Sequence, residues 1–258
     1  MYKAFSELDE IVHIDAEEEI YDLVLHDSVI KSLLPAIHAS YSNFFSIHET
    51  QLARRILANE KPWELLKSFP LYPRYEKLIA DHIQNSPEIK VLAFIGCGPL
   101  PVTLLLFSRL YGIKCIGIDT DAKAVSLAKR CVKHFGLEKE IVIVQGDETA
   151  LLKLEWDSVL IAGLAEPKKR IFKNLRNIIK QKNSQINKSK LRGFESQYSE
   201  LQNPEMKKTI SVCYRNYTGM RQLLYKPVKQ VYIRGFRKIK EISPSGGVNN
   251  TLVFLECE

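Results

Sequence analysis

Two short segments of the chain carry the residue types that hold a nucleoside. VLAFIGCGPLPVT, Val91 to Thr103, is an apolar run that ends in Gly-Cys-Gly-Pro-Leu-Pro, and CIGIDTD, Cys115 to Asp121, is an apolar run that ends in acidic residues. This order predicts a strand, a glycine-bent loop, a helix and a second strand with a carboxylate at its tip. Glycines let the backbone approach a ligand, and the acid receives ribose hydroxyls. The pattern therefore favours binding of an adenosine-containing small molecule.

The residues of the glycine loop limit which nucleoside-containing ligands can bind there. A dinucleotide fingerprint has a third glycine three positions after Gly98, whereas this chain has Pro101 there. Pro99 and Pro101 also lack the backbone N–H groups that cradle a pyrophosphate. The sequence contains no Gly-Lys-Ser/Thr, which excludes a triphosphate loop. S-adenosylmethionine, which has a ribose but no phosphate, fits best; the alternative is an ordinary strand-to-helix turn without a ligand.

Strands that alternate with helices surround these two segments. The alternation implies right-handed crossovers and a mostly parallel sheet, so we predict an α/β fold of the class-I methyltransferase-like (Rossmann) type. The expected strands are Lys90–Ile95, Lys114–Ile118, Ile141–Gln145, Ser158–Ala162, Thr209–Tyr214 and Thr251–Glu256. The expected helices between them are Pro101–Tyr111, Ala122–Phe135 and Pro167–Lys180.

The residues before the first strand indicate helices. Apolar residues recur at three-and-four spacing over Ala16–Leu34 and Ala36–Ala58, with Pro35 expected to separate two helices, and a further helix is expected over Arg74–Gln84. We therefore predict an N-terminal helical domain over residues 1–86 and an S-adenosylmethionine-binding domain over residues 87–258. Residues 181–208, rich in Lys, Asn, Gln and Ser, predict a flexible insertion in the second domain.

Charge is distributed unevenly along the chain. The formal net charge is +7, yet residues 1–165 hold 17 Lys and Arg against 23 Asp and Glu, whereas residues 166–240 hold 20 against 4. Such a basic block could face RNA or a carboxylate-rich substrate, or form a solvated surface. Five scattered cysteines without a CxxC pair indicate a reducing compartment. The sequence has no signal-like N-terminus and no apolar run near the roughly 20 residues that span a bilayer, so we expect a soluble cytoplasmic protein without membrane contact.

Several segments together resemble the nicotianamine synthase family, above all its archaeal members and the bacterial relatives that make opine-type metallophores. The combination of Gly-x-Gly-Pro-Leu-Pro with a Tyr-Thr-Gly-Met-Arg block is specific, because general methyltransferases do not share it. The matching segments are Lys61–Tyr75, Val91–Thr103, Val144–Thr149, Ala165–Asn174, Tyr214–Val228 and Pro244–Thr251.

The resemblance implies a chemistry. The 3-amino-3-carboxypropyl (aminobutyrate) group of S-adenosylmethionine would pass to the amine of an amino-acid acceptor, with release of methylthioadenosine. The product would be a metal-chelating metallophore, and the enzyme itself would need no metal. The archaeal segments favour glutamate as acceptor and repeated additions; the alternative is a single addition to histidine, as in the opine-metallophore pathways. A homodimer is expected by analogy only.

The resemblance also assigns catalytic and substrate-binding residues. Glu49 is expected to be the base that takes a proton from the acceptor ammonium, because the attacking amine must be neutral. Tyr75 is expected near the reacting amine or the transferred carboxylate. From the pattern alone, Glu49 is a solvated charge on a helix and Tyr75 is a core aromatic residue. The residues expected to bind substrate are Tyr72, Arg74, Tyr217 and Arg221, the last as a clamp for a carboxylate.

The cofactor site is expected at the carboxyl ends of the strands. Asp119 should accept the ribose hydroxyls, and Asp147 should bind the adenine amine or, alternatively, cap the helix that follows it. Ala162 should line the far side of the pocket. The complete set of expected cofactor-binding residues is Gly96, Gly98, Pro99, Leu100, Asp119, Asp147, Glu148 and Ala162.

An RNA or DNA methyltransferase with the same fold and cofactor is the main rival hypothesis, since its basic block would grip phosphates. Enzymes that methylate base amines usually follow the fourth strand with an Asn/Asp-Pro-Pro-aromatic segment, and this chain has Gly163-Leu164-Ala165-Glu166-Pro167 there. We therefore do not expect a nucleic acid as partner. A non-catalytic adenosine-binding module is a second rival. The six histidines show no metal-ligand spacing.

Overall fold

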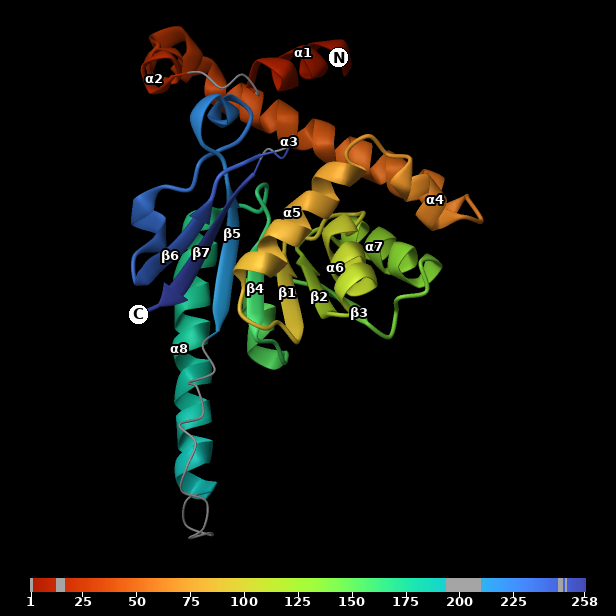
Figure 1. The fold of residues 1–258 in the computed structure, drawn as a ribbon, viewed down its shortest axis with the longest axis vertical. Helices are drawn as coiled ribbons and strands as arrows, with labels where there is room; N and C mark the ends of the chain where they lie inside the picture. Colours follow the sequence, from red (N-terminus) through yellow and green to blue (C-terminus); the bar gives the residue numbers. More distant parts are fainter. Residues whose placement is uncertain (1, 13–16, 194–209, 246–247, 249) are drawn as a thin grey trace.

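A mostly parallel sheet forms the centre of the structure (Figure 1). The computed structural model describes residues 2–12, 17–193, 210–245, 248 and 250–258. Within them the strand order is β3-β2-β1-β4-β5-β7-β6; the strands from β3 to β5 pair in parallel, and β7 pairs antiparallel with β5 and β6. The strands are β1 (Val91–Ile95), β2 (Lys114–Asp119), β3 (Ile141–Gln145), β4 (Ser158–Ile161), β5 (Ser211–Asn216), β6 (Phe236–Ile242) and β7 (Thr251–Cys257).

The strand order reverses beside β1, which lies between β2 and β4. Ile95 pairs with Ile118 on one side and with Ile161 on the other. The chain therefore builds the sheet toward one edge through β2 and β3, and then returns across β1 to start the other half. In open α/β sheets such a switch point leaves a crevice outside the carboxyl ends of the strands, and ligands bind there. The predicted fold class is confirmed.

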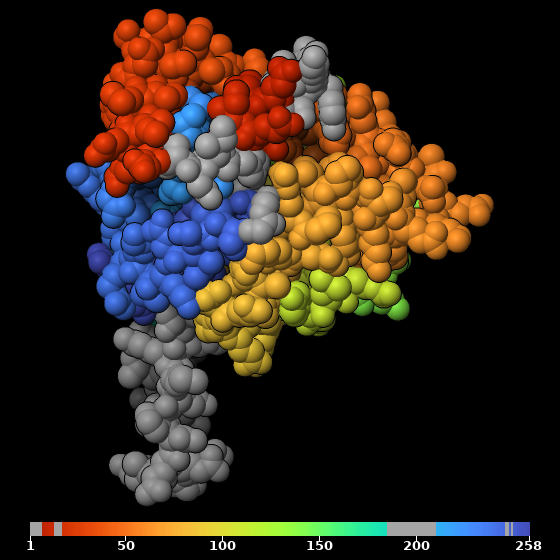
Figure 2. Space-filling model, turned by 45° about the horizontal axis from the view of Figure 1, so that its top comes forward, coloured from red at the N-terminus to blue at the C-terminus, as the bar shows by residue number. Residues whose placement is uncertain are grey.

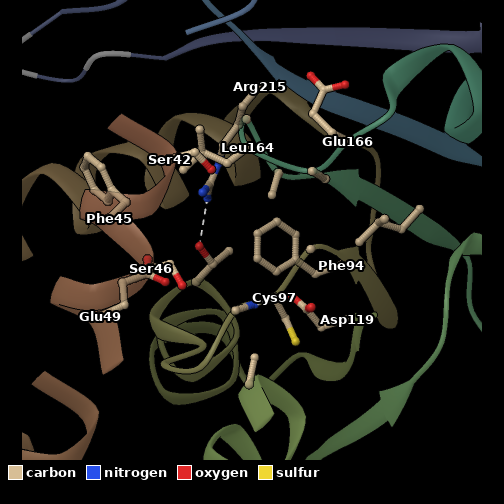
Figure 3. A pocket seen from close by; sticks show the side chains of 18 of the residues that line it. Ser42, Phe45, Ser46, Glu49, Phe94, Cys97, Asp119, Leu164, Glu166 and Arg215 are labelled. Carbon is tan, nitrogen blue, oxygen red and sulfur yellow. Dashed lines mark hydrogen bonds between the residues drawn. The ribbon is translucent and has the colours of Figure 1, made fainter. Parts of the chain in front are cut away.

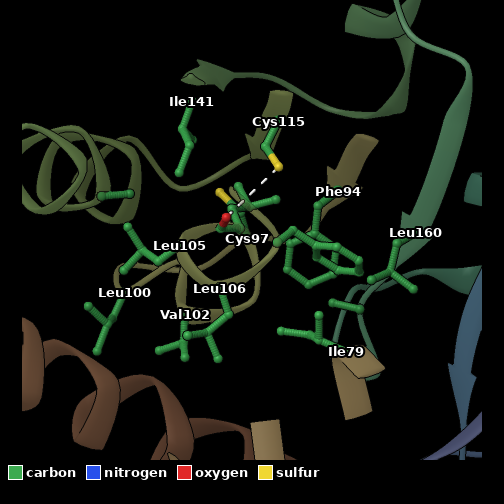
Figure 4. Close-up of a cluster of buried hydrophobic side chains, with 14 of the residues drawn as sticks. Ile79, Phe94, Cys97, Leu100, Val102, Leu105, Leu106, Cys115, Ile141 and Leu160 are labelled. Atoms are coloured by element: carbon green, nitrogen blue, oxygen red, sulfur yellow. Dashed lines mark hydrogen bonds between the residues drawn. The ribbon is translucent and has the colours of Figure 1, made fainter. Parts of the chain in front are cut away.

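Helices cover both faces of the sheet and bury the apolar strands between them. On one face α6 (Val102–Tyr111) and α7 (Ala122–His134) pack with Phe94 and its neighbours, the cluster drawn in Figure 4. On the other face α8 (Lys168–Gly193) places Phe172 and Leu175 against Ala93. Because the central strands β1 and β4 are covered on both sides, their sequences are almost continuously apolar.

Helix α8 is longer than predicted. It continues past the predicted end at Lys180 as far as Gly193, so residues 181–193 are helical and not part of a flexible insertion. No Gly or Pro interrupts residues 168–192, and the Lys, Arg and Gln residues there favour a helix even where apolar residues are few. Residues 194–208 of the predicted insertion lie outside the described residues, as does Thr209 at the predicted start of the fifth strand.

The predicted break at Pro35 is wrong. Pro35 lies inside α3, and the helix begins instead after Asp27, whose side chain accepts hydrogen bonds from the N–H groups of Val29 and Ile30 at 2.9 Å each. A proline costs a helix one hydrogen bond, which a 30-residue helix tolerates. The helices before the sheet are α1 (Tyr2–Val12), α2 (Glu18–His26), α3 (Ser28–Leu57), α4 (Pro62–Lys67) and α5 (Tyr72–Asn85).

The N-terminal helices pack against two different regions, the central sheet and the 3-10 helix η2. Leu52 on α3 and Ile79 on α5 belong to the same buried cluster as Phe94 in the sheet. In contrast, α1 and α2 pack around the 3-10 helix η2 (Gly219–Leu223). Figure 2 shows this red N-terminal segment beside the blue C-terminal one. The domain boundary at residue 86 stays a prediction.

Strand β6 was not predicted. Its residues Arg237, Lys238 and Lys240 are exposed and its apolar residues do not alternate regularly, partly because the pairing with β7 shifts between Lys238 and Lys240. The strand forms the edge of the sheet, where exposed charges prevent pairing with other chains. Those charges make the segment resemble a solvated basic loop in the sequence.

Candidate active site

A pocket opens at the carboxyl ends of the parallel strands, with α3 and α5 on its other side (Figure 3). Its volume is about 420 Å³, which is in the usual range for a small-molecule site. The pocket joins residues from both halves of the chain. The predicted site residues that line it are Glu49, Arg74, Tyr75, Gly96, Gly98, Pro99, Asp119, Asp147, Glu148, Ala162 and Tyr217.

The loop after β1 needs glycine at two positions. Gly96 has φ +81°, and a Cβ on it would lie 2.8 Å from Cβ of Ala165. Gly98 has φ +68°, and a Cβ there would lie 2.8 Å from Oε2 of Glu49. The two glycines therefore let the loop pass between the segment after β4 and helix α3, as the predicted close approach requires.

Asp119 ends β2 and fixes the glycine loop. Its Oδ2 accepts a hydrogen bond from the N–H of Gly98 at 2.9 Å, and its Oδ1 accepts one from the N–H of Asp121 at 3.0 Å. A carboxylate can accept about four hydrogen bonds, so these two leave Asp119, which lines the pocket, with capacity for more. Asp119 thus has the place and the capacity to accept further donors such as ribose hydroxyls.

Glu49 enters the pocket from α3, after Ser42, Phe45 and Ser46 on the same side of that helix (Figure 3). Burial, together with the Asp119 carboxylate, raises the pKa of Glu49 to about 8, against the opposing effect of Arg215. Glu49 is therefore not a solvated surface charge. A carboxyl group with such a pKa exchanges protons near neutral pH, as a general base must.

Two tyrosines form part of the wall. Burial and the nearby Glu49 raise the pKa of Tyr75, so its phenol keeps its proton at neutral pH and can donate it to a hydrogen bond. Tyr217 stacks on Tyr225 with the ring centroids 3.6 Å apart. The Tyr217 hydroxyl lies so close to Gly163 that a Cβ there would be 2.1 Å from it. The ring of Tyr217 is thus held in place by Tyr225 and Gly163.

Arg74 connects the pocket to α1. Its NH1 lies 3.5 Å from Oδ2 of Asp9, and the two side chains are 35% and 29% exposed. Ion pairs this exposed contribute little to stability, about 0–1 kcal/mol. A ligand carboxylate can therefore compete with Asp9 for this guanidinium.

Arg215 lies in the matching segment Tyr214–Val228 but was not among the expected site residues. In the structure it lines the pocket from β5, donates a hydrogen bond from NH2 to Oγ1 of Thr103 at 2.9 Å, and lies over the ring of Phe94 (Figure 3). The alternation in β5 could have identified it, because Val212 and Tyr214 face one side of the sheet and Cys213 faces the other. Arg215 therefore shares the face of Cys213, beside the pocket.

Lys168 was missed altogether. Its ammonium is buried at the start of α8 and donates hydrogen bonds to the carbonyls of Ala162 and Gly163, both at 2.9 Å, and of Ala165. These carbonyls belong to the segment after β4 that lines the pocket. Burial lowers the pKa of Lys168 to about 8. Helical spacing gave a signal, since Lys168 falls on the same face as the buried Ile171 and Phe172.

The two acids after β3 make contacts of their own. Asp147 caps η1 (Glu148–Lys153) and accepts a hydrogen bond from the N–H of Thr149 at 3.0 Å, which is the alternative role given for it above. Glu148 is buried and accepts hydrogen bonds from Nε of Arg170 at 3.1 Å and from Nδ2 of Asn174 at 2.7 Å. Both residues line the pocket, but their carboxylates hold the loop and helix α8.

Three of the expected residues lie away from the pocket lining. Tyr72 and Leu100 are buried in the cluster shared by α5, α6 and the sheet. Arg221 is partly buried in η2, where its Nε has no hydrogen-bond partner. Each of the segments Lys61–Tyr75, Val91–Thr103 and Tyr214–Val228 therefore contains some residues that line the pocket and others that do not. The spacing of residues in the sequence does not distinguish the two kinds.

The described part of the chain lacks two further features, a metal-binding cluster and a membrane-spanning helix. No group of three or more His, Cys, Asp or Glu residues there is arranged to hold a metal ion. None of the described helices is both long and apolar enough to cross a membrane.

Comparisons with known proteins place the chain in context. The family model described as "Nicotianamine synthase protein" matches residues 3–196. The crystal structure of MtNAS in complex with MTA and tNA is 30% identical, with a TM-score of 0.81 over 98% of this chain and 86% of that one. A glutamate-to-glutamine mutant of MtNAS in complex with S-adenosylmethionine matches with the same identity and TM-score over 98% and 89% of the two chains.

A curated relative matches over a shorter segment. The probable cobalt-precorrin-6B C(15)-methyltransferase (decarboxylating) of Saccharolobus solfataricus (strain ATCC 35092 / DSM 1617 / JCM 11322 / P2) is 34% identical over 83 residues. The match covers 30% of this chain and 41% of that protein, so the chain spans less than half of this relative's length. Such a segment is too short to transfer an activity.

Proposed function

Because the chain belongs to the nicotianamine synthase family, we propose that it is an S-adenosylmethionine-dependent transferase that moves the 3-amino-3-carboxypropyl group to the amine of an amino acid and releases methylthioadenosine. The observation that carries this proposal is Glu49. Its carboxyl group lies in the pocket beside the Gly98 loop, with a pKa of about 8. The loop is the element that would hold the donor, and the carboxyl group is the base that the acceptor needs.

The donor would lie along the strand ends. Asp119 has open acceptor positions for the ribose hydroxyls, and the glycines at 96 and 98 let the backbone approach the sugar and the sulfur. The backbone around Gly146 and Asp147 would border the adenine, since the Asp147 carboxylate caps η1. The complexes of MtNAS with MTA and of its mutant with S-adenosylmethionine support S-adenosylmethionine as the donor.

Glu49 would prepare the acceptor for attack. It takes one proton from the acceptor ammonium and leaves a neutral amine, and its pKa of about 8 makes this transfer nearly balanced near neutral pH. The Tyr75 hydroxyl, which stays protonated, can donate a hydrogen bond at the same place. When bound, S-adenosylmethionine supplies a sulfonium-activated carbon, so that a C–N bond forms there as the C–S bond breaks and methylthioadenosine leaves.

We further propose an acceptor of the glutamate type, with more than one addition, and a metal-chelating product. Three arginines line the pocket, Arg74, Arg170 and Arg215, and the partly exposed ion pair between Arg74 and Asp9 is one that a second ligand carboxylate can replace. Glutamate has a second carboxylate that could bind the guanidinium of Arg74, and histidine has none. The enzyme itself would bind no metal, and a homodimer is expected from the family resemblance alone.

The alternative that the protein is a nucleic-acid methyltransferase gains no support from the basic block of residues 166–240. Several of its cations bind groups of the protein itself: Lys168 binds backbone carbonyls, Arg170 binds Glu148, and Arg215 binds Thr103. The high net charge of residues 166–240 therefore partly reflects the packing of α8 and β5.

Product analysis tests the proposal. Purified protein is incubated with S-adenosylmethionine and with glutamate, histidine or alanine separately, and the products are identified by mass spectrometry. We expect methylthioadenosine and glutamate carrying one or more aminobutyrate groups. Formation of S-adenosylhomocysteine would instead show methyl transfer, and transfer to histidine in preference to glutamate would overturn the acceptor assignment.

A further inference from the structure

Two polar atoms in the pocket have no hydrogen-bond partner although both are buried: Nε of Arg215 and Oδ1 of Asn250. Nε is a donor, because a guanidinium keeps its protons in proteins, and Oδ1 is an acceptor. A buried donor or acceptor without a partner is costly, so such groups in a pocket indicate that a ligand supplies the missing bonds.

The sheet brings the two residues to the same face. Strands β5 and β7 pair with Arg215 opposite Leu252 and Asn216 opposite Thr251. Asn250 precedes Leu252 by two positions, so it points to the same side as Leu252 and Arg215. The donor and the acceptor therefore face one region of the pocket from adjacent strands.

The position of Arg215 is fixed before any ligand binds. Its NH2 donates to Oγ1 of Thr103 at 2.9 Å, its guanidinium lies 5.3 Å from the centre of the Phe94 ring, and the residue is only 8% exposed. Despite these contacts, Nε of Arg215 is buried and has no hydrogen-bond partner. A preorganised guanidinium of this kind is suited to a carboxylate.

The order of the strands indicates which carboxylate. In the proposed function the nucleoside lies over the ends of β3 and β2, because Asp119 ends β2 and Asp147 follows β3. The sulfur and the arm then extend over β1 and β4, and the next strand in the sheet is β5, which carries Arg215. The distal end of the arm is an α-amino acid, with a carboxylate and an ammonium group.

We propose that Arg215 and Asn250 together bind the α-amino-acid end of the transferred arm, with the carboxylate on Arg215 Nε and the ammonium on Asn250 Oδ1. This inference rests on the proposed function. With Asp119 at the ribose and Arg215 at the carboxylate, both ends of the donor are held, and the carbon between them is kept at a constant position beneath Glu49. The pair thereby selects the arm over the methyl group as the part that is transferred.

Three ligands separate this role from a structural one: S-adenosylmethionine, its decarboxylated analogue and methylthioadenosine, which lacks the arm. Their dissociation constants are measured by calorimetry for the wild type, Arg215→Gln and Arg215→Lys, with Arg237→Gln as the control. Arg237 is an exposed arginine of β6, 65% exposed at its side chain. We expect Arg215→Gln to weaken S-adenosylmethionine by roughly 10- to 100-fold, as for a lost hydrogen bond to a charged group, and Arg215→Lys to weaken it less. The other two ligands should bind unchanged, and Arg237→Gln should affect none of them.

Asn250→Leu completes the test. It should weaken S-adenosylmethionine and the decarboxylated analogue equally, since both keep the amine, and leave methylthioadenosine unchanged. An equal loss for all three ligands in Arg215→Gln would mean a structural role and overturn the inference. Unchanged donor binding with a higher KM for the acceptor would assign Arg215 to the acceptor, which also overturns it. A wild-type protein that binds neither S-adenosylmethionine nor methylthioadenosine would instead contradict the proposed function.

Discussion

The carboxylate of Glu49 lies against the backbone of Gly98, so close that a Cβ on this glycine would be 2.8 Å from Glu49 Oε2. Glu49 belongs to helix α3, and Gly98 belongs to the loop after β1. The contact therefore joins the N-terminal helices to the sheet at the place where base and donor have to meet. Neither the helices nor the sheet alone holds both groups.

Substitution of Gly98 by alanine should disable this contact. The new Cβ would displace the Glu49 carboxylate, and the positive φ of +68° would add a strain of about 1–2 kcal/mol. We expect turnover to fall at least about tenfold beyond what the loss of stability explains. Gly112→Ala is a matched control, because Gly112 has φ +66° and open space around its Cβ position. Equal kinetic effects of the two substitutions would contradict the importance of the contact.

The protonation of Glu49 should appear in the stability of the protein. The pKa of about 8 in the folded state is above the ordinary value of 4.5, so the folded protein holds a proton that the unfolded chain releases between these values. The stabilisation is fully present below pH 4.5 and is lost as the pH rises through 8. Relative to Glu49→Gln, the free energy of unfolding of the wild type should fall by on the order of 1–3 kcal/mol between pH 4.5 and 8. Above pH 8 the difference between the two proteins should stay constant. Urea unfolding at several pH values measures it, and parallel curves for the two proteins would contradict it.

Removal of the Lys168 ammonium should destabilise the segment after β4, residues 162–165, that lines the pocket. Lys168→Met leaves the carbonyls of Ala162, Gly163 and Ala165 without their donor, which should cost about 3 kcal/mol or more of unfolding free energy. S-adenosylmethionine should also bind more weakly. The control is Lys169→Met, since Lys169 is the exposed neighbour on the same helix. A Tm for Lys168→Met equal to that of the control would show that these hydrogen bonds do not support this segment.

Asp119 should be needed for the nucleoside itself. Asp119→Asn weakens the acceptor that binds Gly98 and removes the charge offered to the ribose, so we expect methylthioadenosine to bind roughly 10- to 100-fold more weakly. Asp121→Asn is the control: Asp121 also lines the pocket but caps α7 by accepting a hydrogen bond from Lys123 N, and asparagine caps a helix equally well. Similar affinities for the two variants would argue against ribose binding by Asp119.

The sequence located the cofactor loop because strand, glycine loop and acid are close together in the chain. Gly96, Gly98 and Asp119 could be placed from local pattern alone, and all three line the pocket. Glu49 needed the family resemblance, since a glutamate on a helix looks the same whether it faces solvent or a pocket. Its environment comes from Asp119 and Arg215, far away in sequence.

The errors have physical causes that the sequence only partly reveals. Pro35 did not break α3 because a long helix tolerates one missing hydrogen bond, and the real break is the cap at Asp27. Arg215 and Lys168 carry charge, so they were counted with the basic surface, although strand alternation and helical spacing place both on inward faces. Tyr72, Leu100 and Arg221 belong to matching motifs, yet the fold leaves them outside the pocket lining.

The proposed reaction depends most on Glu49 as the base that activates the acceptor. The most direct measurement compares the wild type with Glu49→Gln in two assays: calorimetric binding of S-adenosylmethionine, and release of methylthioadenosine in the presence of glutamate. We predict affinities within about threefold of each other and a release rate at least about 100-fold lower in the variant, as for loss of a general base. An unchanged release rate in Glu49→Gln would contradict the central claim.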